Sequence, residues 1–169
     1  MKKHFICTIF FVIAFTLLAQ PVQAQANAGN IAPDFTIKAL DGNEITLSKL
    51  QGKYVLIDFW GSWCMPCRRS SPLMVELYGK LKEKKANIEF ISIACNERNE
   101  EIWKKAIIDD KLTWIQLNDA HASPNSIAAQ YAIRGVPTCI LVSTDGKILY
   151  REHPVTLIEK VETLFEITK

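Results

Sequence analysis

Residues 54–67 read Tyr-Val-Leu-Ile-Asp-Phe-Trp-Gly-Ser-Trp-Cys-Met-Pro-Cys, an apolar run that ends in two closely spaced cysteines. The run Tyr54–Trp60 is typical of a buried β-strand. Beyond Pro66, leucines recur at every fourth position from Leu73 to Leu81, which predicts one apolar stripe on an α-helix. Pro66 suits the first turn of that helix, where its missing N–H costs nothing. The two cysteines therefore lie where a buried strand gives way to a helix.

The Cys64–Cys67 pair has the spacing of a dithiol that can close an internal disulfide. A sulfur at a helix N-terminus is stabilised as a thiolate by unpaired backbone N–H groups and by the helix dipole. Cys64 is placed at that start and Cys67 one turn inside it. We therefore expect Cys64 to be the exposed attacking nucleophile and Cys67 to be shielded and to resolve the mixed disulfide.

A zinc site is the main alternative use of two such cysteines, and it would need two further ligands at suitable spacing. The remaining cysteines, Cys7, Cys95 and Cys139, are isolated, and the three histidines form no pair. No metal is therefore expected, and a purely structural disulfide remains the alternative. Cys95 and Cys139 are expected to be buried free thiols. A second disulfide between them stays open in an oxidising compartment.

The motifs around this pair resemble those of the thioredoxin superfamily. They comprise Asp58–Arg68 around the cysteines and, far downstream, Ile133–Thr138, which includes a Val-Pro-Thr sequence. The opening Ala32–Phe35, the Asp41-Gly42 pair and Leu47–Lys53 are similar to the N-terminal segment of exported TlpA/ResA-like thiol-disulfide oxidoreductases. The resemblance extends over essentially the whole chain beyond its apolar leader.

Strand and helix patterns alternate along the chain and favour an α/β fold, with a mixed central sheet covered by helices on both faces. The resemblance implies a thioredoxin-like three-layer fold with an N-terminal hairpin. Strands are expected at 34–39, 44–47, 54–60, 88–94, 114–117, 138–143 and 147–151. Besides the helix after Pro66, helices are expected around 102–107, from Ser123-Pro124 to Tyr131, and over 157–165.

Asp58 interrupts an otherwise apolar strand, where a carboxylate is costly and should be partly protonated near neutral pH. The resemblance implies that it moves a proton to or from Cys67. Thioredoxins pair the matching acid with a lysine on a neighbouring strand, but Ile88–Cys95 contains none. An acid that simply reaches water at the strand end is the alternative.

Four further residues are candidates for contact with substrate. The resemblance implies that Pro137 follows a cis peptide bond, packs against the disulfide and lets the backbone at Val136 pair with an extended substrate. Trp63, with Trp60, is a candidate for an apolar collar around Cys64, although core packing is the alternative. Pro66, between the two cysteines, is the remaining candidate. Arg68 and Arg69 are expected to lie on the solvated helix surface, and the alternative is that they add positive potential near the thiolate.

The N-terminus has the pattern of a secretory signal peptide. Two lysines and a histidine precede the apolar stretch Phe5–Leu18, which is too short for a membrane span and is followed by small residues. We expect residues 1–24 to be removed, with cleavage after Ala24 or alternatively after Ala26, and residues 25–169 to form the thioredoxin-like domain. The domain would then be periplasmic, or membrane-anchored if the leader is not cleaved.

Composition narrows the function further. The chain has 20 Lys and Arg against 18 Asp and Glu, and two of the lysines belong to the leader, so the remaining domain is formally neutral. Since no basic stripe is present, nucleic acid is not an expected partner. We expect a monomer that reduces protein disulfides without a metal or organic cofactor. Because an exported protein lies beyond the cytosolic reductants, a membrane thiol donor is implied.

Three other functions stay open. A disulfide oxidase or isomerase would use the same residues and differ in redox potential. A thiol peroxidase would need a Pro-x-x-x-Thr-x-x-Cys sequence that Phe59–Cys64 does not supply. A non-catalytic binding module on this fold would be expected to lose a cysteine or the proline, whereas Cys64, Cys67 and Pro137 are all present.

Overall fold

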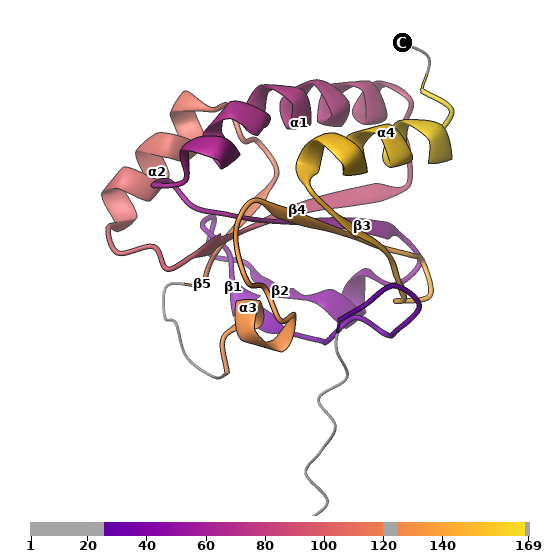
Figure 1. Ribbon diagram of the computed structural model, residues 1–169, viewed down its shortest axis with the longest axis horizontal. Helices are drawn as coiled ribbons and strands as arrows, with labels where there is room; N and C mark the ends of the chain where they lie inside the picture. Colours follow the sequence, from indigo (N-terminus) through magenta and orange to yellow (C-terminus); the bar gives the residue numbers. More distant parts are fainter. Residues whose placement is uncertain (1–25, 120–124, 168–169) are drawn as a thin grey trace, which may run out of the picture.

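The apolar run around Asp58 forms β3 (Tyr54–Trp60), the middle strand of a five-stranded sheet in the order β5-β4-β3-β6-β7. This computed structural model describes residues 26–119 and 125–167 (Figure 1). Strands β4 (Ile88–Cys95) and β5 (Ile115–Asp119) run parallel to β3. Strand β6 (Thr138–Val142) is antiparallel to both β3 and β7 (Ile148–Glu152). The expected mixed sheet is confirmed.

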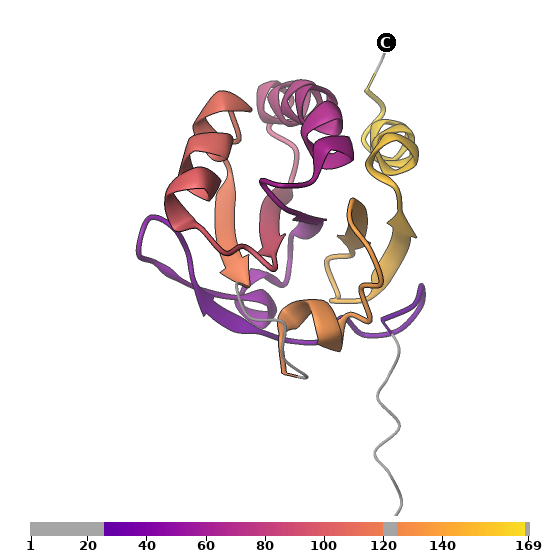
Figure 2. The ribbon, with the colours of Figure 1, turned by 60° about the vertical axis from the view of Figure 1, so that its left-hand side comes forward.

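Helices and the hairpin cover the two faces of this sheet (Figures 1 and 2). On one face lie α1 (Met65–Glu83), α2 (Glu100–Asp109) and α4 (Pro154–Leu164). On the other face lie the short α3 (Ile127–Gln130), the hairpin of β1 (Thr36–Lys38) and β2 (Glu44–Thr46), and the 3-10 turn Leu47–Leu50. The three-layer, thioredoxin-like arrangement is as expected.

Alternation along β3 divides the hydrophobic core into two halves, because successive side chains of a strand point to opposite faces. Leu56 and Trp60 pack with the core that contains α1 and α4. Val55, Ile57 and Phe59 pack against the hairpin and α3. Asp58 shares the parity of Leu56 and Trp60, so its carboxyl group faces the helix that carries the cysteines.

The helix expected from Ser123-Pro124 to Tyr131 is shorter than predicted. Helix α3 begins at Ile127, and Ser126 caps it by accepting a hydrogen bond from the Ala129 N–H at 3.1 Å. Ser123 and Pro124 lie outside the described residues. The Ser-Pro pair resembled a cap, but the competing cap at Ser126 defines the start.

The N-terminal segment is joined to α3 and to the sheet by polar contacts as well as by its apolar residues. The hydroxyl of Tyr131, at the end of α3, donates to the Pro33 carbonyl at 2.7 Å, and the Leu40 N–H donates to the Gln116 carbonyl at 2.9 Å. The expected leader, residues 1–24, lies outside the described part of the chain. Among the residues described, no helix has the length and apolar character to cross a bilayer.

Candidate active site

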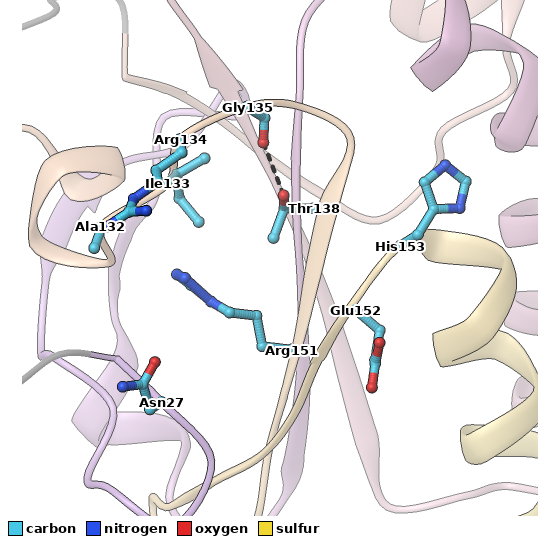
Figure 3. A pocket seen from close by; sticks show the side chains of 9 residues that line it. All are labelled: Asn27, Ala132, Ile133, Arg134, Gly135, Thr138, Arg151, Glu152 and His153. Carbon is cyan, nitrogen blue, oxygen red and sulfur yellow. Dashed lines mark hydrogen bonds between the residues drawn. The ribbon is translucent and has the colours of Figure 1, made fainter.

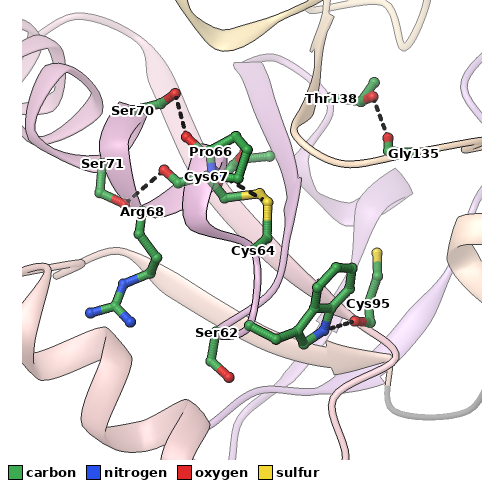
Figure 4. Close-up of a disulfide and its surroundings, with 12 residues drawn as sticks. Ser62, Cys64, Pro66, Cys67, Arg68, Ser70, Ser71, Cys95, Gly135 and Thr138 are labelled. Atoms are coloured by element: carbon green, nitrogen blue, oxygen red, sulfur yellow. Dashed lines mark hydrogen bonds between the residues drawn. A yellow bond between two sulfur atoms is a disulfide. The ribbon is translucent and has the colours of Figure 1, made fainter.

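The Cys64–Cys67 disulfide lies at the start of α1 (Figure 4). Its S–S distance is 2.07 Å. Cys64 is the N-cap of the helix, and its Sγ accepts a hydrogen bond from the Cys67 N–H at 3.2 Å. Pro66 occupies the first turn, as expected. The helix start therefore supplies a donor to the Cys64 sulfur, and that bond strengthens when the sulfur becomes a thiolate.

The prediction that Cys64 is exposed and Cys67 is shielded is wrong for the disulfide form. Both residues are 4 % exposed in the disulfide form, whereas their neighbours Trp63 and Met65 are 55 % and 62 % exposed. The exposed apolar surface surrounds the disulfide instead of the sulfur itself being open to solvent. What separates the two cysteines is their position on the helix: Cys64 caps it, while Cys67 lines an interior cavity.

The loop before the disulfide is shaped by the indole of Trp63. Its Nε1 donates to the Cys95 carbonyl at 3.2 Å, which lays the ring back over Gly61. A Cβ on Gly61 would lie only 2.7 Å from Trp63 Nε1, so any other residue there would have to displace the indole. Trp60 is buried in the core and does not share this surface. The predicted collar therefore contains Trp63 without Trp60.

A buried acid that the sequence did not suggest fixes the same loop. The carboxylate of Glu97 accepts from the Ser62 N–H at 2.9 Å and from the Ser62 hydroxyl at 3.0 Å. Both residues are buried. Glu97 stands in the polar stretch 96–101, which is typical of a solvated loop, so no local signal marked it. Its contacts connect the β4–α2 loop to the cysteine loop.

Asp58 is buried, and its burial raises its pKa from 3.8 to about 6. Two hydrogen bonds oppose this shift: Ser92 Oγ donates to Oδ2 at 3.1 Å, and Cys139 Sγ donates to Oδ1 at 3.3 Å. Trp114 Nε1 in turn donates to Ser92 Oγ at 2.8 Å. Ser92 and Cys139 are the direct cross-strand neighbours of Asp58 on β4 and β6. Ser92 thus stands on the neighbouring parallel strand, where thioredoxins would supply a lysine.

A cavity of about 10 Å³ connects Asp58 to the redox pair. Asp58 and Cys67 both line it, together with Pro137 from the start of β6 and Trp114. That volume is close to the minimum that one water molecule requires. Asp58 and the inner cysteine, Cys67, therefore border the same small space.

The Val136–Pro137 peptide bond is cis. It lies between α3 and β6, and Pro137 faces the cavity that Cys67 lines. The Thr138 hydroxyl donates to the Gly135 carbonyl at 2.8 Å and closes the turn around this bond (Figure 4). Val136 and Pro137 are half-buried, so a second chain can approach them from solvent.

The prediction that Arg68 lies on the solvated helix surface is wrong. Its guanidinium binds Asp110 through both Nε and Nη2, with the Nη2–Oδ1 distance 2.8 Å. The hydrogen bond to Asp110 raises the pKa of Arg68. This pair connects α1 to the end of α2. Arg69 is exposed, as expected.

Cys95 and Cys139 are buried free thiols, so a second disulfide is excluded. They lie on opposite faces of the sheet, Cys139 on the side of α1 and Cys95 on the side of α3. Burial raises the pKa of Cys95 to about 12 and that of Cys139 well above its ordinary value. Within residues 26–119 and 125–167, no group of three or more His, Cys, Asp or Glu residues could hold a metal ion.

Comparisons with known proteins agree on one class. A family model described as the AhpC/TSA family matches residues 28–151. The thiol-disulfide oxidoreductase ResA of Bacillus cereus is 36 % identical over 121 residues, which cover 72 % of this chain and 66 % of the relative, just under two thirds of its length. The ResA of Halalkalibacterium halodurans is 34 % identical over 173 residues, covering 100 % of this chain and 94 % of the relative.

Solved structures give the same result for the fold. The thioredoxin domain of a thiol-disulfide oxidoreductase from Bacteroides vulgatus superposes with a TM-score of 0.72 at 35 % sequence identity. The match covers 82 % of this chain and 98 % of that domain.

Replacing Asp58 by Asn should stabilise the fold in a pH-dependent way. Burial raises the pKa of Asp58 to about 6, so its ionisation destabilises the folded state. This destabilisation grows as the pH rises from about 4 to about 6 and reaches its full size above about pH 6. Asp58→Asn should raise the free energy of unfolding by about 1–3 kcal/mol at pH 8 and much less at pH 4. Urea unfolding of the disulfide form at both pH values measures this. A gain that does not vary with pH would contradict a buried, titrating carboxyl group.

The order of reactivity of the two thiols can be measured directly. Because the start of α1 favours a thiolate at Cys64, brief iodoacetamide treatment of the reduced protein should label Cys64 before Cys67. Peptide mass spectrometry identifies the modified residue. Prior labelling of Cys67 would reverse the two roles.

Proposed function

Because this chain belongs to the AhpC/TSA family, as a ResA-like thiol-disulfide oxidoreductase of the thioredoxin superfamily, we propose that it is an exported reductase of protein disulfides. The observation that carries the proposal is the shared cavity in which the resolving cysteine Cys67 faces Asp58, beside the cis proline. The cysteines alone would suit a structural disulfide. A buried acid placed against one of them supplies the proton transfer that exchange requires.

The reaction proceeds in two exchanges. The Cys64 thiolate attacks one sulfur of the substrate disulfide, forms a mixed disulfide and releases the other substrate sulfur as a thiolate, which takes up a proton. Asp58 accepts the proton of Cys67, and the Cys67 thiolate attacks the sulfur of Cys64. The second substrate sulfur leaves as a thiolate and takes up the proton that Asp58 holds, so the carboxylate is restored. Two electrons pass to the substrate, and the Cys64–Cys67 disulfide remains.

The surface around the disulfide suits an extended polypeptide. Trp63, Met65 and Pro66, next to the cysteines in sequence, are exposed, and Val136 and Pro137 are half-buried. We assign Trp63 and Pro66 to apolar contact with substrate and the backbone at Val136 to strand pairing. Substrates are therefore disulfide-containing proteins, and a single copy of the chain contains every group used.

Export follows from the leader pattern in residues 1–24, which ends in the small residues around Ala24 and Ala26. Outside the cytosol the oxidised pair cannot draw on cytosolic reductants, so a thiol donor in the membrane must restore the dithiol. The domain 25–169 then works in the periplasm, or at the membrane if the leader is retained.

The dipeptide between the cysteines favours the reductase direction. Strongly oxidising members of this fold place a hydrogen-bond donor such as histidine there, which stabilises the thiolate and hence the reduced form. Met65 and Pro66 offer no side-chain donor. An ionised Asp58 facing Cys67 also disfavours a thiolate on that cysteine. Both effects lower the reduction potential.

Equilibration with a glutathione redox buffer should therefore give a potential nearer to about −270 mV, as in thioredoxin, than to the −120 mV of a strong oxidant. The fraction of oxidised protein can be read by alkylation and gel shift. A value above about −180 mV would assign the protein to the oxidases or isomerases.

A Cys67→Ser variant should trap substrates, since the Cys64 mixed disulfide can form but cannot be resolved. Covalent adducts that dithiothreitol releases, recovered from periplasmic extract, would name the substrates. Cys64→Ser is the matched control and should trap none. If neither variant forms adducts while the native protein consumes peroxide, the protein is a thiol peroxidase and the reductase proposal fails.

A further inference from the structure

The segment that precedes the cis proline also forms a wall of a second, larger cavity, of about 540 Å³ (Figure 3). One wall is the α3–β6 connection and the other is the end of β7. The lining residues are Asn27, Ala132, Ile133, Arg134, Gly135, Thr138, Arg151, Glu152 and His153. The reaction described above uses neither of the two arginines in this lining.

Arg151 extends from β7 toward the α3–β6 connection (Figure 3). One of its amino groups, Nη2, donates to the Tyr131 carbonyl. Its Nε is buried and has no hydrogen-bond partner among the described residues. Because this Nε is closed off from the cavity, a ligand there can meet only the amino groups of the Arg151 guanidinium.

Arg134 adds a second positive charge to the same cavity. Its side chain is exposed, and its proximity lowers the pKa of Arg151, in addition to the larger effect of burial. The acid in the lining, Glu152, is paired with Lys160 instead. Within the described part of the chain, neither arginine forms an ion pair with a carboxylate. The cavity therefore carries uncompensated positive charge.

The cavity adjoins the substrate-pairing segment. Gly135 and Thr138 line it, and these residues directly flank Val136 and Pro137. An extended chain rises about 3.3 Å per residue. A substrate strand paired at Val136 would therefore bring a side chain about two to four positions from its cysteine to Arg134.

We propose that this cavity binds carboxylate side chains of an acidic segment that lies next to the disulfide in the protein substrate. The assignment of that ligand to the substrate rests on the proposed function. Arginine suits the task because its planar fork binds a carboxylate through two parallel hydrogen bonds. Arg134 makes the first contact at the rim of the cavity. Arg151 donates to the carboxylate further inside.

Binding can be tested without turnover. The probes are two cysteine-free peptides, acetyl-Ser-Glu-Thr-Glu-Thr-Gly-amide and its counterpart with Gln in place of Glu, titrated by calorimetry into the disulfide form at low salt. The Glu peptide should bind about five-fold or more tightly than the Gln peptide. Arg134→Gln should abolish most of that preference. Arg98→Gln changes the charge equally at an exposed position outside the cavity and should leave the preference intact.

Three results of the peptide titrations would overturn the proposal. The first is equal affinity for the Glu and Gln peptides. The second is an equal loss in Arg98→Gln, which would indicate general attraction of anions by the whole protein. The third is that succinate displaces the Glu peptide and binds with the same dissociation constant as the peptide. This result would assign the cavity to small dicarboxylates.

Versions of the two peptides that carry a disulfide can be tested as substrates. Their rates of reduction distinguish this proposal from the reductase assignment. Faster reduction of the Glu peptide, with the advantage lost in Arg134→Gln alone, supports both. Equal reduction of both peptides by the native protein leaves the reductase standing and overturns the acidic-segment assignment. If the Glu peptide binds tightly but neither peptide is reduced, the cavity remains a carboxylate site. The proposal that its ligand belongs to a substrate of a reductase is then overturned.

Discussion

The burial of one carboxylic acid in the central strand is the constraint on which the rest of the site depends. Asp58 is placed by the register of β3 on the face that carries α1, opposite Ser92 on one side and Cys139 on the other. Both neighbours donate hydrogen bonds to it, and Trp114 holds Ser92 in place. Without these donors the carboxyl group would be a buried, unsatisfied polar group of the kind that folds avoid.

The architecture was predictable because it follows from patterns that persist over many residues. The apolar run of β3, which only Asp58 interrupts, and the four-residue leucine repeat of α1 each specify one element with little competition. The start of α3 was not predictable in the same way. Two capping signals, Ser123 and Ser126, stand three residues apart there, and the local sequence does not decide between them.

The polar parts of the site were harder to predict because their partners are distant in sequence. Glu97 meets Ser62 across 35 positions, Asp58 meets Cys139 across 81, and Arg68 meets Asp110 across 42. Glu97, Cys139 and Arg68 carry no local signal of these contacts: they are an acid in a polar loop, a cysteine in an apolar strand and an arginine on a helix. Only the strand register and the docking of α1 against α2 make them partners, so the tertiary fold had to be known first.

The burial of the two remaining thiols has a consequence for how the domain behaves over many catalytic cycles. The four cysteines within the described residues could pair in three complete ways, and a chain that cycles between dithiol and disulfide is repeatedly given the chance to exchange partners. Here Cys95 and Cys139 are closed off from one another by the sheet, and burial keeps both protonated and unreactive. The native state therefore has a single disulfide isomer, and repeated oxidation returns the domain to the same covalent structure.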